Sequence, residues 1–170
     1  MVKNFLCHRV NPKRDPLWDP MDVGLFDKCI RFISKKYNIY LIEDLVNVDF
    51  KKEKGNFAAI IFDDGYKDNI QYAAPILDRH KCKASFYVVT DCIDKNIPPW
   101  TQVLEHQFYF TNKESINMVF DFLPEEYRVK KLSSKSERVQ YVKKIKPFLK
   151  IISHEQRTLI LNRVAEAYSD

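Results

Sequence analysis

Two adjacent carboxylates, Asp63 and Asp64, stand directly after an uninterrupted apolar run at residues 57–62. The run, Phe-Ala-Ala-Ile-Ile-Phe, lacks the polar alternation of a half-buried strand, so it predicts a strand with both faces buried, as in a parallel sheet. Functional sites in parallel α/β folds form beyond the carboxyl ends of the strands. Because adjacent strand residues point in opposite directions, one carboxylate can bind a metal ion while the other transfers a proton.

Gly65 follows the acidic pair and extends the candidate site. A glycine permits positive φ and lets the backbone approach a ligand closely. The competing interpretation is structural: an aspartate side chain that caps a turn at the start of a helix. Spacing alone does not decide between a site and such a turn.

The segments before the acidic pair predict a strand, a loop and a helix. Residues 4–7 suit a short strand, and the three prolines of residues 11–20 indicate a loop. Asp22 is placed to cap a helix. The apolar residues of that helix recur at one-face spacing: Phe26, Cys29, Ile30 and Ile33. Residues 39–42 form a further short β-prone run.

The segments after the acidic pair predict a helix and a second strand. An apolar helical face is formed by Ile70, Ala73, Ala74 and Leu77. Pro75 cannot donate a backbone hydrogen bond, so we expect a kink or two short helical pieces. Residues 84–89 predict a second buried strand. Strand, helix and strand make a βαβ unit with a right-handed crossover.

Beyond Trp100 the pattern becomes helical. Two capping boxes, Ser134-x-x-Glu137 and Ser153-x-x-Gln156, each precede an apolar helical repeat. Pro147 should bend or end the first of these helices. We therefore predict an α/β part at residues 1–100 and a wholly helical segment or insertion of the same domain at residues 101–170.

Several short motifs occur in order along the first half of the chain. They are Cys-His-Arg-Val at 7–10, Ile-Phe-Asp-Asp-Gly-Tyr at 61–66, Tyr-Lys-Asp-Asn at 66–69, Ala-Pro-Ile-Leu at 74–77 and Lys-Ala-Ser-Phe-Tyr-Val at 83–88. The set resembles the N-terminal part of the polysaccharide deacetylase family, also called carbohydrate esterase family 4, and an ordered set is more specific than one motif. The resemblance implies an incomplete distorted (β/α) barrel followed by a helical C-terminal part.

The resemblance also implies an activity, the metal-dependent hydrolysis of an N-acetyl or O-acetyl group on a carbohydrate. In such enzymes the aspartate at the position of Asp63 is the catalytic base, and the one at the position of Asp64 binds the metal beside two histidines. A divalent cation, usually Zn²⁺ for this ligand set, polarises the carbonyl and lowers the pKa of bound water. The base then takes the proton from that water.

The chain departs from the family pattern in its histidines. The family's paired His-[Ser/Thr]-x-x-His motif is missing, since the only histidines are His8, His80, His106 and His154. A later motif with a catalytic acid histidine is missing too. We therefore expect a fragment, or a natural truncation, that does not hydrolyse acetyl groups by itself. It should hold Zn²⁺, or another divalent metal, only weakly, because one carboxylate does not make a closed site.

Four further residues are candidates to line the site or bind substrate: His8, Gly65, Tyr66 and Trp100. His8 should lie near the end of the first strand, although a lone histidine there more often forms a structural hydrogen bond. Trp100 is suited to stack on a sugar ring, and loop or core packing would explain it equally well.

Two other functions compete with the deacetylase interpretation. A receiver-type phosphotransfer domain also places an acidic pair after a buried strand to hold Mg²⁺. Such a domain needs a phosphoacceptor aspartate at the end of a later strand. Asp91 directly follows the next predicted strand, which is one strand too early for that role. The second alternative is a non-catalytic interaction module derived from a deacetylase.

Composition narrows the partners and the location. The net charge of +5 gathers late in the chain, but no nucleic-acid recognition motif accompanies it, so we expect a solvated helix face and no nucleic-acid partner. No apolar segment approaches membrane-spanning length, and the four cysteines form no Cys-x-x-Cys pair. A cytoplasmic protein with a carbohydrate substrate is the expectation. The sequence leaves the particular sugar and the oligomeric state open.

Overall fold

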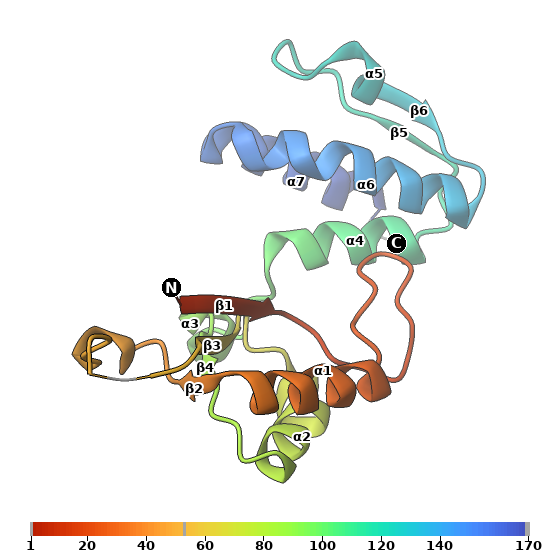
Figure 1. Ribbon diagram of the computed structural model, residues 1–170. Coiled ribbons are helices and arrows are strands. Elements are labelled where there is room, and N and C mark those ends of the chain that lie inside the picture. Colours follow the sequence, from red (N-terminus) through yellow and green to blue (C-terminus); the bar gives the residue numbers. More distant parts are fainter. Residues whose placement is uncertain (1, 53, 169–170) are drawn as a thin grey trace. The chain divides into compact units, whose positions relative to one another are not determined.

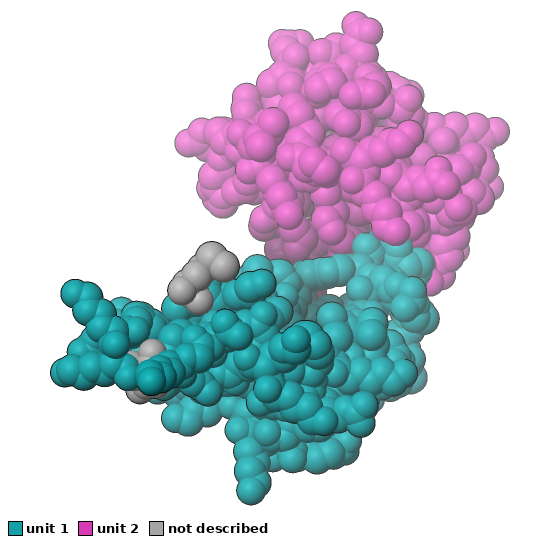
Figure 2. Space-filling model, in the orientation of Figure 1, with its two compact units in different colours: residues 1–93 teal, residues 94–170 magenta. Residues whose placement is uncertain are grey.

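The computed structural model describes residues 2–52 and 54–168 (Figure 1). The chain divides into two compact units, residues 1–93 and residues 94–170 (Figure 2). Each unit packs around a hydrophobic core of its own.

Unit 1 is an α/β structure built on a parallel sheet. Its elements are β1 (Val2–Cys7), α1 (Val23–Lys36), β2 (Asn38–Tyr40), η1 (Leu45–Asn47), β3 (Phe57–Phe62), η2 (Asn69–Ala73), α2 (Ala74–Arg79), β4 (Ser85–Phe86) and α3 (Thr90–Asp94). The central strand β3 pairs in parallel with β1 along its whole length, with β2 at its start and with β4 at its end. The described strands form an open four-stranded sheet, so the α/β class is confirmed and a distorted barrel stays a prediction.

The strand that carries the acidic pair is the most buried in unit 1. Five of its six residues are buried, and only Ile61 is partly exposed. Ile60 and Phe62 share a core cluster with apolar residues of α1 and α2. Alternation places Ala59, which is also fully buried, on the other face. The prediction of a strand buried on both faces is therefore confirmed.

The helix α1 begins and packs as its sequence predicts. Asp22 is its N-cap and accepts a hydrogen bond from the backbone N–H of Leu25 at 2.9 Å. Phe26, Ile30 and Ile33 are buried against the sheet, while Cys29 is half-buried. The helix thus covers one face of β1 and β3 with the stripe expected from its apolar spacing.

The helix after the acidic pair is divided into two pieces, as Pro75 predicts. A π-helical turn, η2, runs to Ala73, and α2 continues with Pro75 in its first turn, where its missing N–H is tolerated. The predicted apolar face is wrong at Ile70, which is 70% exposed, whereas Asn69 is buried. In a π turn each N–H bonds to the carbonyl five residues earlier, so side chains are spaced differently around the axis than in an α-helix. The buried face therefore includes Asn69 and not Ile70.

The second strand is shorter and more exposed than its sequence suggests. Only Ser85 and Phe86 pair with β3, and the four apolar residues 86–89 are each 38–49% exposed. No described strand pairs with the other edge of β4. The prediction of a buried strand over residues 84–89 is therefore wrong, because burial of such a run depends on neighbours that its sequence does not specify.

Unit 2 is mainly helical. Its elements are α4 (Trp100–Phe110), β5 (Ser115–Asn117), α5 (Glu125–Arg128), β6 (Val129–Lys131), α6 (Lys135–Ile151) and α7 (His154–Tyr168). The antiparallel pair of β5 and β6 corrects the expectation of a wholly helical segment. Each of these strands is only three residues long, too short to show period-two alternation in the sequence.

Both predicted capping boxes are present in unit 2. Ser134 and Glu137 exchange side chain-to-backbone hydrogen bonds of 3.2 and 2.8 Å. Ser153 and Gln156 do the same at 3.3 and 3.2 Å. Pro147 does not end α6, which continues to Ile151.

The late cluster of basic residues is partly engaged within unit 2. Lys146 pairs with the buried Glu105, Arg138 donates to the backbone carbonyl of Phe108, and the Lys135 ammonium lies 3.6 Å from the Tyr109 ring centroid. None of the helices in the described residues is long and apolar enough to cross a bilayer.

We predict that Ser134→Ala lowers the free energy of unfolding of unit 2 by about 1 kcal/mol, because the first turn of α6 loses its capping acceptor. Chemical denaturation followed by circular dichroism measures the change. Ser136→Ala is the matched control, since Ser136 is an exposed serine in the same turn. Equal stability of the two variants would contradict a stabilising role for the capping box.

Candidate functional site

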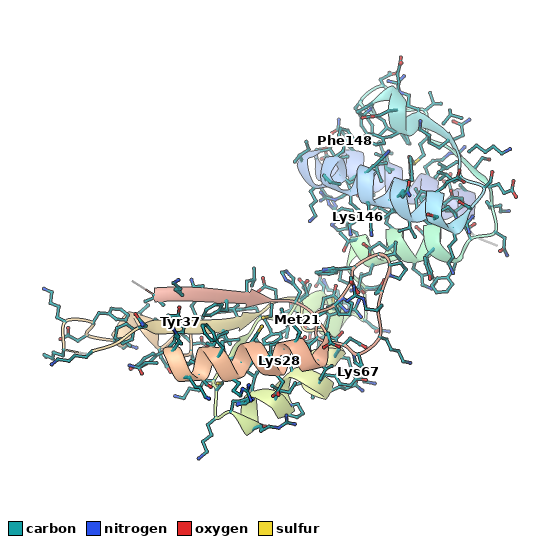
Figure 3. All side chains as sticks on the ribbon, turned by 45° about the vertical axis from the view of Figure 1, so that its right-hand side comes forward. Met21, Lys28, Tyr37, Lys67, Lys146 and Phe148 are labelled. Atoms are coloured by element: carbon teal, nitrogen blue, oxygen red, sulfur yellow. The ribbon has the colours of Figure 1, made fainter. Side chains whose placement is uncertain are left out.

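The acidic pair forms a tight turn at the carboxyl end of β3. The backbone N–H of Asp63 donates to the carbonyl of Cys7 at 3.1 Å, which continues the pairing of β1 with β3. Asp64 and Gly65 then adopt positive φ values of 71° and 67°. In Figure 3, Met21 and Lys67 lie beyond the tip of β1, whereas Tyr37 lies toward its start. The residues after β1 and β3 therefore gather at one end of the sheet.

The two carboxylates are half-buried and not engaged by the protein. Among residues 2–52 and 54–168, no hydrogen bond or ion pair is made by the side chain of Asp63 or Asp64. Capping aspartates elsewhere in the chain behave differently: Asp15 and Asp22 each accept from a backbone N–H two or three residues ahead. The structural alternative of a capped turn predicts such bonds at Asp63 or Asp64, so this observation favours a site.

Gly65 is required by both conformation and space. A Cβ atom added to it would stand 2.8 Å from Cγ1 of Val88, well inside van der Waals contact. Its positive φ adds a conformational cost for any other residue. Gly65 therefore lets the segment after β4 pack directly on the acidic turn.

An aromatic cluster flanks the turn. The Trp18 ring lies 5.2 Å from the His8 ring and 5.4 Å from the Tyr66 ring, centroid to centroid. Extending the register Leu6↔Ile61 and Cys7↔Phe62 by one residue places His8 beside Asp63. Thus His8, Asp63, Asp64, Gly65 and Tyr66, all predicted from the sequence, lie together.

A network of charges fixes the loop that carries Trp18. The Arg9 guanidinium donates to Asp68 at 3.0 Å and to Asp15 at 2.9 Å. Asp15 in turn accepts from the backbone N–H groups of Leu17 at 3.0 Å and of Trp18 at 3.4 Å. The loop over residues 11–20 is therefore tied through Arg9 to the segment after the acidic pair.

A buried amide completes the network. The Asn69 side chain, in the orientation that satisfies its neighbours, donates to the carbonyl of His8 at 2.9 Å and to Asp68 at 3.2 Å. Asp68 and Asn69 are 6% and 2% exposed. The start of the helix after the acidic turn is thus anchored to the end of β1 by buried polar groups.

The network shifts the pKa values of two of its members. Burial of Arg9 acts to lower the pKa of its guanidinium, but the hydrogen bonds to Asp15 and Asp68 outweigh it and raise that pKa above its ordinary value. Burial acts to raise the pKa of Asp15, and its bonds to Leu17, Arg9 and Trp18 reverse this, so the pKa of that carboxyl is lowered. The charged pair is thus favoured at neutral pH.

Trp100, the remaining predicted lining residue, belongs to unit 2. Its ring packs against the core of that unit, and the Arg157 guanidinium lies 5.2 Å from the ring centroid. A substrate role for Trp100 stays a prediction. No sequence pattern pointed to Trp18 or Asp15, because both lie in a proline-rich loop without periodicity.

The donor set around the turn does not fit a closed metal site. The described residues contain no group of three or more histidine, cysteine, aspartate or glutamate side chains placed to bind one ion. Burial, and then the nearby Cys29 thiol, raise the pKa of Cys7 to about 11, so at neutral pH Cys7 is a protonated thiol and a poor ligand. Protein-bound zinc usually has at least three protein ligands, which these residues alone do not supply.

Comparison with protein families identifies the segment that carries this site. The sequence model of the polysaccharide deacetylase family matches residues 50–119. This segment is therefore similar to the corresponding part of polysaccharide deacetylases. It includes the acidic turn and β4, so the resemblance drawn from the motifs is confirmed.

Three solved structures are similar to the chain. The Streptococcus pyogenes deacetylase PplD, in complex with acetate, is 19% identical, with a TM-score of 0.49 and coverage of 61% of this chain and 50% of that one. IcaB from Ammonifex degensii is 17% identical, with a TM-score of 0.47 and coverage of 61% and 47%. A de-N-acetylase from Aggregatibacter actinomycetemcomitans is 18% identical, with a TM-score of 0.49 and coverage of 81% and 68%.

The chain therefore spans about half the length of the first two of these structures. Comparison with curated proteins gives no match.

We predict that Gly65→Ala destabilises unit 1 by at least about 1–2 kcal/mol, because alanine resists positive φ and its Cβ would meet Val88. Urea denaturation measures the loss. In a Val88→Ala background the clash is absent, so Gly65→Ala should there cost only the part of the free energy of unfolding that comes from the positive φ. Gly24→Ala is the control, because Gly24 lies in α1 and its φ is not left-handed. A Gly65→Ala variant as stable as the wild type would show that the turn relaxes freely.

We also predict a pH dependence from Asp15. Because its folded pKa is lowered, its contribution is present above the unfolded value of about 3.9 and is lost as the pH falls through the folded value. The stability difference between wild type and Asp15→Asn should be below about 1 kcal/mol at pH 7, since the Asp15 side chain is 34% exposed. It should shrink toward pH 3. Asp78→Asn, an exposed change on α2, is the control, and a difference that grows on acidification would contradict the assignment.

Proposed function

We propose that this chain supplies the first acidic motif of a metal-dependent carbohydrate deacetylase, with Asp63 as the catalytic base and Asp64 as a metal ligand. The observation that carries the proposal is the pair of unengaged carboxylates at the carboxyl end of the central strand. They lie within the segment that matches the polysaccharide deacetylase family. The reaction is hydrolysis of an acetyl group, and its substrate is an N-acetylated or O-acetylated carbohydrate.

The turn suits two carboxylates for different tasks. Asp63 continues the alternation of β3, so it lies on the face of Ala59 and Ile61, away from α1 and α2. A half-buried carboxylate that the protein does not engage can accept a proton from an attacking water. The left-handed conformation of Asp64 turns the chain at once, so its carboxylate need not compete for the same proton.

We further propose that these 170 residues alone do not hydrolyse acetyl groups. One carboxylate from the turn and a nearby imidazole leave a divalent ion short of protein ligands, so binding should be weak. The cytoplasmic location stays a prediction from the sequence.

The test measures acetate release from chitotriose, the trimer of N-acetylglucosamine, with and without added Zn²⁺. We predict that the 170-residue chain releases no acetate above the level of its Asp63→Asn variant. It should also bind Zn²⁺ far below one equivalent after dialysis. The product of the native coding region, read beyond codon 170 for a His-[Ser/Thr]-x-x-His motif, provides the comparison.

Where that motif follows, the native product should release acetate. Asp63→Asn should abolish turnover and leave the metal content intact, whereas Asp64→Ala should lower both. Turnover that survives Asp63→Asn would remove Asp63 from the role of base. Metal content unchanged by Asp64→Ala would remove Asp64 from the ligand set.

A further inference from the structure

Trp18 lies where no motif predicted a functional residue. It stands on the loop between β1 and α1, half-buried, with its ring contacting His8 on one side and Tyr66 on the other. These two neighbours belong to the segments on either side of the acidic pair. Trp18 therefore spans the end of the sheet at which Asp63 and Asp64 emerge.

A small cavity opens beside the Trp18 ring. It has a volume of about 160 Å³ and is lined by Trp18, His8, Asp19 and Met21, among others. Pockets for drug-sized ligands have volumes of about 300–1,000 Å³, so this one admits a single ring or a substituent. Its wall combines an aromatic face, a thioether and polar groups that can hydrogen-bond to hydroxyls.

The charges around the cavity favour a neutral ligand. Asp19 and Arg9 line it, and both are ion-paired within the protein, Asp19 with Arg14 and Arg9 with Asp15 and Asp68. A phosphate or another anion would therefore find no cation in the wall that lacks a carboxylate partner. A sugar ring brings hydroxyl groups for the polar wall and an apolar C–H face for the indole, without adding charge.

The Trp18 loop is ordered before any ligand binds. Asp15 holds the backbone N–H of Trp18, and Arg9 holds Asp15 and also donates to the carbonyl of Trp18 at 3.4 Å. An aromatic face that is already fixed costs less conformational entropy on binding. This is the arrangement that a stacking residue requires.

We propose that Trp18 is the stacking face of a sugar subsite beside the acidic turn, which takes one ring of a neutral, N-acetylated sugar chain. The proposal rests on the proposed function, because it names the substrate class of the same site. Arg9 and Asp15 act as positioning residues for the indole. His8 and Asp19 supply the polar wall, and Met21 offers a contact for the acetyl methyl group.

The two tryptophans of the chain, Trp18 and Trp100, allow a direct test. In a Trp100→Phe chain, the fluorescence reports Trp18 alone. Titration with chitotriose should change the Trp18 emission saturably. In ligand-observed NMR, Trp18→Ala should weaken chitotriose binding on the order of tenfold, because the stacking area is lost. Trp18→Phe should restore part of the affinity.

Folding is checked separately for each variant by circular dichroism and thermal unfolding. Asp15→Asn, which keeps an oxygen acceptor for the loop, should weaken binding less than Trp18→Ala. Chitotriose binding that is unaffected by Trp18→Ala would overturn the subsite and leave the proposed function standing. Absence of any chitotriose binding would also overturn the subsite. The proposed function is decided independently by acetate release from the native product.

Discussion

One guanidinium shared by two carboxylates joins the segments that surround the acidic turn. Arg9 comes from the end of β1, Asp68 from the start of the helix after β3, and Asp15 from the loop that carries Trp18. Because Asp68 is only 6% exposed, removal of Arg9 would leave a buried carboxylate without its cation, a change that typically costs about 3–5 kcal/mol. The Arg9–Asp68 ion pair therefore stabilises this end of the sheet and also fixes the geometry of the candidate site.

The parallel sheet explains why these groups meet at all. The carboxyl ends of β1 and β3 are aligned by six consecutive register pairs, from Val2↔Phe57 to Cys7↔Phe62. Whatever follows each strand must then emerge side by side, which places His8 next to Asp63. A one-residue slip in this register would turn Ile60 and Phe62 away from the core they share with α1 and α2 and would put the small Ala59 in that core. The rigid strand holds the chemistry, and the loops supply the groups around it.

The sequence predicted the parts of this arrangement that depend on local pattern. The apolar run of β3, the Asp22 cap of α1, the break at Pro75 and both capping boxes are local signals, and all are present. The errors arise where the structure depends on distant neighbours. Residues 86–89 resemble a buried strand but lack a second partner, and Ile70 is displaced by a π turn. The roles of Trp18 and Asp15 could not be predicted from the sequence, because they depend on contacts between the loop and the end of the sheet that form only on folding.

The backbone at Asp64 bears on whether the acidic pair is chemical or structural. A φ of 71° is unfavourable for most residues and easy for glycine, which follows directly at Gly65. Aspartate tolerates this conformation best when its side chain bonds to the local backbone. Asp64 makes no such bond among the described residues, so the turn gains nothing from its carboxylate. Strain of this kind gathers at functional sites. Glycine would suit this backbone conformation better than aspartate does. The presence of a carboxylate at Asp64 therefore favours a role for it in binding.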